Sequence, residues 1–123
     1  MDAPYKRLIE LCDRLRTGTE TGKVVWQADG DAAFAWSSSS GSVNVRSLDD
    51  DGDEPFELAL FSPGGQKVET LASEWAEDET PAAWNAPLGR LYRAARRQAL
   101  GVDKILDDLF AELPTAPAER QSA

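Results

Sequence analysis

Residues 23–36, KVVWQADGDAAFAW, decide the fold, because the spacing of the apolar side chains changes there. Before this stretch the apolar positions recur every three or four residues, as on one face of a helix. Within it, Val24 and Trp26 alternate with their neighbours, which is the period of a β-strand. The DGD sequence at 29–31 is typical of a turn, and Phe34 lies in the next alternating segment. The stretch therefore predicts that a helix gives way to a β-hairpin.

The same alternation continues through three more short segments. SSSSG at 37–41 and SPGG at 62–65 are turn sequences. Two alternating segments lie between these turns, and an acidic loop connects the two segments. Such short connections make neighbouring strands antiparallel. We therefore predict an antiparallel meander of about five strands. Its apolar face carries Val24, Trp26, Ala28, Phe34, Trp36, Val43, Val45, Phe56, Leu58 and Leu60.

Helical spacing flanks this sheet on both sides. An N-terminal helix is predicted to end at TGTETG (17–22), and a C-terminal helix at Gly101, which favours a left-handed stop. Asp103 would cap a second short helix, KILDDLFAEL. A sheet with one apolar face needs one covering layer. We predict a single α+β domain over residues 1–113, with the N-terminal helix and two C-terminal helices on one face of the sheet. The apolar helix positions are Tyr5, Leu8, Ile9, Cys12, Leu15, Leu88, Leu91, Tyr92, Ala95, Ala99, Ile105, Leu106, Leu109, Phe110 and Leu113.

Composition excludes several kinds of chemistry. The 123 residues include no histidine and one cysteine, Cys12, so neither a Ser-His-Asp triad nor a Cys-His pair can form within the chain. Cys12 lies in an apolar stripe and is interpreted as a buried hydrophobe. LDDDGDEPFE is not an EF-hand loop, because Leu58 stands where the last calcium ligand would be. We expect a non-enzymatic protein with no metal and no cofactor.

The sequence also bears on location. There is no apolar run near the roughly 20 residues that a membrane span needs. The N-terminal residues are charged and amphipathic, unlike a signal peptide. With a single cysteine and hence no internal disulfide, these features favour the cytoplasm. PTAPAERQSA, at 114–123, has the composition of a disordered C-terminal tail.

Charge is distributed unevenly along the chain. The net charge is −9, yet residues 88–101 carry four arginines and no acid. Residues 48–79 carry eleven acidic residues against one lysine. The arginines occupy the side of their predicted helix opposite its apolar positions, so a solvated helix face or pairing with the acidic loops accounts for them without a ligand. They are Arg90, Arg93, Arg96 and Arg97.

Two binding hypotheses follow from this distribution. The first is a protein-interaction module, such as a regulator, an adaptor or an immunity-type inhibitor, that uses its acidic surface on a partner with a basic surface. The second is binding of an anionic ligand or a nucleic acid through the four arginines, although the net charge opposes nucleic acid. Whether the protein is a monomer or a homodimer is left open. The candidate residues are Arg90, Arg93, Arg96 and Arg97 for an anion, and Asp49, Asp50, Asp51 and Asp53 for a basic partner.

Trp84 is the remaining candidate. It stands between two prolines in the linker AEDETPAAWNAP at 76–87. An exposed tryptophan there would be a typical anchor for a protein partner. Alternatively, its ring folds back and covers the edge of the core.

The closing pattern LYRAARRQALGVDKILDDLFAEL follows a GKVVW strand and a run of short strands. In this it resembles small uncharacterised bacterial α+β proteins that end in an Arg-rich helix and a GVD turn. The resemblance spans about Leu8 to Leu113 and implies the α+β fold and a bacterial source. It carries no activity over to this chain.

Overall fold

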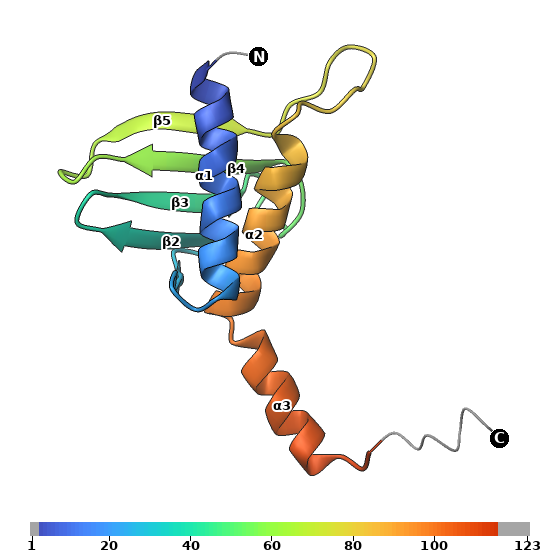
Figure 1. Ribbon diagram of the computed structural model, residues 1–123. Coiled ribbons are helices and arrows are strands. Elements are labelled where there is room, and N and C mark those ends of the chain that lie inside the picture. Colours follow the sequence, from blue (N-terminus) through green and yellow to red (C-terminus); the bar gives the residue numbers. More distant parts are fainter. Residues whose placement is uncertain (1–2, 116–123) are drawn as a thin grey trace.

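A computed structural model describes residues 3–115. A five-stranded sheet forms one layer, and helices on one of its faces form the other (Figure 1). The elements in chain order are α1 (Ala3–Glu20), β1 (Gln27–Ala28), β2 (Ala33–Ser38), β3 (Gly41–Ser47), β4 (Phe56–Phe61), β5 (Lys67–Ala72), α2 (Asn85–Ala99) and α3 (Val102–Glu112).

The sheet is the predicted antiparallel meander. Its strands follow the order β1-β2-β3-β4-β5, and each pairs with its sequence neighbour. Phe34 pairs with Val45, which in turn pairs with Leu58, so the alternating apolar residues form rows across one face. This face is covered by α1 and α2, which lie side by side (Figure 1). The α+β class and the element order are confirmed.

Burial identifies the core between these layers. It takes residues from both helices and from the sheet, with Tyr92 of α2 stacked on Phe56 at 4.4 Å between ring centroids. The Tyr92 hydroxyl donates a hydrogen bond of 3.0 Å to the carbonyl of Ala32. The core cluster comprises Leu8, Cys12, Leu15, Val24, Trp26, Phe34, Val43, Val45, Phe56, Leu58, Leu71, Leu88, Leu91, Tyr92 and Ala95.

The first strand is shorter than its sequence pattern predicted. β1 pairs with β2 through Gln27 and Ala28 alone. Trp26 is buried, but its backbone N–H donates to the side-chain oxygen of Gln98 on α2, at 2.7 Å, and not to a strand. A side chain 72 positions away thus replaces the sheet partner that the alternation implied.

Two helix boundaries also differ from prediction. α1 continues through Thr17 to Glu20, so the TGTETG segment ends the helix later than expected. Thr19 is buried there and joins a hydrogen-bond chain, with its hydroxyl donating to the Leu15 carbonyl and accepting from the Trp26 indole. At the other end, Gly101 has the predicted left-handed conformation, with φ of 65°. Gly101, and not Asp103, is the N-cap of α3.

The two C-terminal helices bury very different amounts of surface. α2 contributes seven buried residues and contacts β2, β3 and β4. α3 follows after the link Leu100–Gly101 and extends away from the two-layer body (Figure 1). None of the residues of α3, all of which the structure describes, is buried. The predicted tail at 114–123 lies outside the described residues from residue 116 onward.

Candidate functional site

The acidic residues gather at one end of the sheet. The loops 48–55 and 73–84 both leave from that end, because Ser47 pairs with Phe56 and the Ser73 backbone N–H donates to the Phe56 carbonyl. We call these two loops together the acidic end. They contain nine acidic residues and no basic residue, while the rest of the chain contains thirteen of each. The whole net charge of −9 is therefore carried by the acidic end.

Local hydrogen bonds hold the loop 48–55 in place. The buried Ser47 hydroxyl lies 3.0 Å from an Asp51 carboxylate oxygen, and the Asp53 backbone N–H donates to the same oxygen at 2.9 Å. The Asp53 backbone bond, followed by the Ser47 bond, lowers the pKa of Asp51. Asp53 itself accepts from the Glu54 backbone N–H. Asp51 and Asp53 therefore stabilise the conformation of the loop through hydrogen bonds within it.

The other carboxylates of this loop point into solvent. Asp49, Asp50 and Glu54 are exposed, and within residues 3–115 their carboxylates take part in no ion pair or hydrogen bond. Asp50 adopts a left-handed φ of 56°, a conformation that aspartate and asparagine tolerate better than most residues. These three side chains are the part of the loop that is available to a partner.

The second loop of the acidic end is fixed at both of its ends. The Asn85 side chain accepts from the Glu74 backbone N–H and donates to the Glu74 carbonyl. Asn85 therefore joins the loop to α2 and does not cap the helix. Trp84 stacks on Tyr5 of α1 at 4.7 Å and donates its indole N–H to the Ala72 carbonyl at 2.7 Å. Its ring covers the edge of the core, as the second sequence interpretation had it.

The four arginines of α2 are exposed but do not form one cluster. At about 100° per residue, Arg90, Arg93 and Arg97 fall within about 60° of one another. They line a shallow cavity of about 280 Å³, together with Arg16 of α1. Arg96 lies about 60° beyond Arg93 around the helix and does not line this cavity. Burial raises the pKa of Tyr92, which the Arg96 charge opposes and the charges of two loop aspartates reinforce.

Acids adjacent to this cavity partly neutralise it. Arg97 pairs with Asp103 at 2.6 Å, and Arg16 pairs with Glu20 at 3.2 Å. Arg93 lies over the Phe56 ring, with 5.8 Å from its guanidinium carbon to the ring centroid. Across the described residues 3–115, no ion pair joins the α2 arginines to the acidic end. Arg16 was missed by sequence reasoning, because its spacing to Glu20 is that of an ordinary helix pair and the fold alone brings it to α2.

The exposure of the apolar face of α3 is a further feature, which the sequence did not reveal. The apolar side chains of α3 follow helical spacing, but they contact no core. Phe110 is 66% exposed, Leu113 at the C-cap is 58% exposed and Ile105 is 53% exposed. Large apolar side chains that share an exposed face mark an interaction site in soluble proteins. The face, which we call the α3 face, comprises Ile105, Leu106, Leu109, Phe110 and Leu113.

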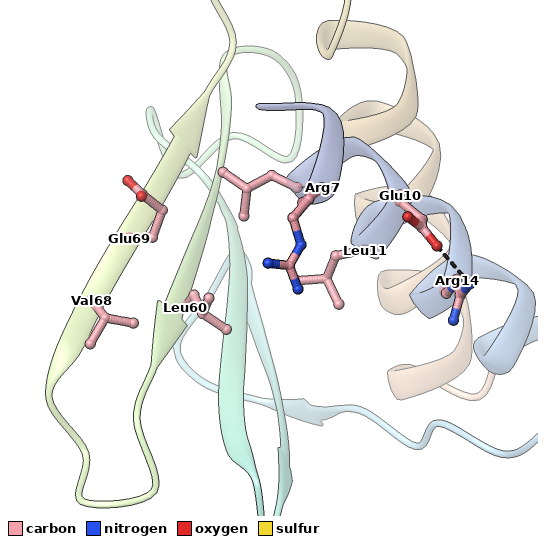
Figure 2. A pocket seen from close by; sticks show the side chains of 8 residues that line it. Arg7, Glu10, Leu11, Arg14, Leu60, Val68 and Glu69 are labelled. Atoms are coloured by element: carbon pink, nitrogen blue, oxygen red, sulfur yellow. Dashed lines mark ion pairs between the residues drawn. The ribbon is translucent and has the colours of Figure 1, made fainter. Parts of the chain in front are cut away.

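A groove lies on the other side of α1 from α2. Figure 2 shows α1 on one side of it and β4 and β5 on the other. Its volume is about 600 Å³. Arg7 and Arg14 lie along its α1 edge, and Arg14 pairs with Glu10 at 2.6 Å. The groove, which we call the α1–β5 groove, is apolar at Leu8, Leu11, Leu60 and Val68, with Glu69 on the strand side.

Metal sites, membrane-spanning helices and similarity to known proteins also bear on function. No group of three or more His, Cys, Asp or Glu side chains within residues 3–115 is arranged to hold a metal ion. The helices in this part of the chain are too short or too polar to cross a membrane. Comparison of the chain with protein-family models, curated proteins and solved structures finds no match. The surfaces described above are therefore the basis for assigning a function.

Proposed function

We propose that this protein is a non-enzymatic protein-interaction module whose acidic end captures a partner with a basic surface. The observation that carries the proposal is the concentration of charge: two loops of the fold hold nine acids and no base. Such a concentration creates a local negative potential that accelerates encounter with a cationic surface. A bacterial cytoplasmic regulator, adaptor or immunity-type inhibitor would use the surface in this way.

The anchored backbones of the acidic end support a role in binding a partner protein rather than a role only in keeping the protein soluble. Both loops are anchored by a buried polar side chain, Ser47 in one and Asn85 in the other. Their backbones are held before a partner arrives, so binding would not have to order them. Within residues 3–115 no basic side chain neutralises the carboxylates of either loop. A partner's lysines and arginines would therefore meet unpaired acids.

The test compares two variants with equal charge change. One removes three exposed acids of the loop 48–55, by Asp49→Asn, Asp50→Asn and Glu54→Gln. The matched control removes three acids away from both loops, by Asp13→Asn, Glu20→Gln and Glu112→Gln. Each protein is used to capture partners from a bacterial lysate, and the captured proteins are quantified by mass spectrometry at low and high salt.

We expect the wild type and the control to enrich the same basic protein. The loop variant should enrich this protein at least several-fold less. Exposed charges at the edge of an interface mainly raise the association rate, so removing them lowers the amount of partner captured. Capture should also weaken with salt, since screening shortens the range of the field. Equal capture by the loop variant and the control would refute the acidic end as the binding surface.

A second candidate function rests on the cavity between α1 and α2. Arg90 and Arg93 take part in no ion pair within residues 3–115, and Arg16 and Arg97 adjoin them. We propose an anionic ligand there as the alternative. Binding of a labelled oligonucleotide or of inorganic phosphate that weakens steeply with salt, and is lost in Arg90→Gln/Arg93→Gln, would favour it over the acidic end. Binding that Arg96→Gln reduces equally would contradict it, because Arg96 lies outside the cavity.

A further inference from the structure

The α3 face has the pattern of a helix that binds in a groove. At about 100° per residue its five apolar side chains cover an arc of about 140°, which is the width of a core-facing stripe. Nothing in residues 3–115 covers it, since Phe110 and Leu113 are more than half exposed. Acids border the stripe on both sides: Asp103 and Asp107 on one, Asp108 and Glu112 on the other.

The α1–β5 groove matches this helix in length and chemistry. The α3 face extends over nine residues, from Ile105 to Leu113, or about 12 Å at the helical rise. The α1 edge of the groove extends over eight residues, from Arg7 to Arg14, or about 10 Å. The groove is apolar along its floor, and Val68 on its strand side is 53% exposed. A helix lying in it would cover the apolar groups on both sides.

The charges of α3 and of the α1–β5 groove also bear on this pairing. Arg7 extends from α1 toward the strands (Figure 2), and it pairs with no acid in the described part of the chain. Arg14 already pairs with Glu10, and Glu69 lies on the strand side, so Arg7 is the unpaired charge that an acidic flank of α3 would meet. Two α3 helices packed against each other would instead bring together two surfaces that each hold four acids, of which Asp103 and Asp108 are paired, with Arg97 and Lys104, and Asp107 and Glu112 are not. Like charges thus disfavour α3–α3 pairing and favour the groove.

The groove cannot receive the α3 of its own chain. Arg7 lines the groove and Arg16 lines the cavity shared with α2, and nine helical positions put them about 180° apart on α1. α2 and the groove are therefore on opposite sides of α1. The link from α2 to α3 is two residues, Leu100 and Gly101, and spans at most about 10 Å. Passing around a helix about 10 Å in diameter needs a longer link.

We propose that α3 docks into the α1–β5 groove of a second copy of this chain. Each copy has one helix to give and one groove to fill, so a reciprocal pair closes as a dimer with two equivalent contacts. This self-association uses surfaces separate from the acidic end, and it stands or falls independently of the proposed function.

The test is the molecular mass of the full chain by sedimentation equilibrium over a range of protein concentrations. Phe110→Glu alters the helix, and Val68→Glu and Arg7→Glu alter the groove from two different elements. All three positions are exposed, so each variant should remain folded by circular dichroism. The matched controls are Val25→Glu, at 55% exposure against 53% for Val68, and Lys6→Glu, next to Arg7 on α1.

We expect the wild type and both controls to dimerise. Phe110→Glu and Val68→Glu should raise the dimer Kd by at least about 30-fold, as expected when a central apolar contact is lost. Arg7→Glu should raise it by less, because one rim charge is reversed. A wild type that stays monomeric at all concentrations would overturn the proposal. So would Val68→Glu and Arg7→Glu proteins that dimerise like their controls, which is the result expected for α3–α3 pairing.

Mixing two defective variants identifies the contact directly. The Phe110→Glu protein keeps an intact groove, and the Val68→Glu protein keeps an intact α3. With one of the two labelled by a fluorophore, their mixture should associate more tightly than either variant associates with itself. No difference between mixed and self-association would overturn the helix-in-groove contact. The acidic end is unchanged in all these proteins, so partner capture through it is measured separately.

Discussion

Thr19→Val should destabilise the fold markedly although it changes no volume. The Thr19 hydroxyl accepts the indole N–H of Trp26 at 2.8 Å, and the two residues are 6% and 2% exposed. Valine has the same shape, so no cavity forms, but the indole N–H loses its partner in the core. A buried donor without a partner costs about 1–3 kcal/mol. The bond from Thr19 to the Leu15 carbonyl adds little, since such back-bonding within a helix is weak.

We therefore expect the free energy of unfolding to fall by about 2 kcal/mol. For a chain of this length that corresponds to a decrease in Tm of about 8 °C. Urea unfolding followed by tryptophan fluorescence gives the free energy, and circular dichroism gives the Tm. Thr17→Val is the matched control, because Thr17 lies on the same helix and is exposed.

A double-mutant cycle separates the hydrogen bond from other effects. In a Trp26→Phe background there is no indole N–H to satisfy, so Thr19→Val should cost less than about 0.5 kcal/mol. A Thr19→Val variant as stable as Thr17→Val would refute the reasoning. So would an equal cost of Thr19→Val with and without the indole.

The remaining predictions concern three other positions. Burial raises the pKa of the Cys12 thiol to about 12 from 9.0, so below pH 9 the thiol contributes its full stability, which is lost as the pH rises from 9 to 12. Iodoacetamide should label Cys12 at the rate of unfolding, and Cys12→Ala should lose less stability between pH 8 and pH 11 than the wild type. Tyr92→Phe should cost about 1 kcal/mol in urea unfolding, near the low end for a buried carbonyl, because the Ala32 carbonyl keeps the Ser47 backbone N–H as a second donor; a loss above about 3 kcal/mol would contradict this account. Gly101→Ala strains a left-handed residue by about 1–2 kcal/mol, so amide exchange should become faster in α3 and stay unchanged in α1; unchanged exchange in α3 would refute it.

The order of the elements and the core were predictable because periodicity reports directly on burial. Phe34, Val45 and Leu58 alternate along their strands, and they form adjacent pairs across the sheet. The same signal failed at Val24 and Trp26. Both are buried as the alternation requires, but Trp26 bonds to Gln98 of α2 instead of a strand. Periodicity gives the buried side of a segment and not the identity of its hydrogen-bond partner.

The candidate surfaces were predictable in composition but not in arrangement. The sequence gives the acids of the two loops, while the register of β3, β4 and β5 puts both loops at one end. Arg16 joins Arg90 and Arg93 through the packing of α1 on α2, for which the sequence carries no local signal. The apolar pattern of α3 was clear, yet a pattern of that kind normally indicates a helix packed on its own core. The exposure of Phe110 is apparent only once α1 and α2 are placed on the sheet, because these two helices already cover its apolar face.

The position of α2 between the two proposed surfaces has a consequence for assembly. The helix begins at the acidic end and leads into α3 at its other end, and its 15 residues measure about 22 Å. A partner on the acidic end would therefore bind well away from α3. Because the net charge lies at one end, the field of a cationic partner would also rotate the molecule before contact and turn that end toward it. A dimer would present two such ends, and a partner with two basic patches would bind it with higher avidity than a monomer.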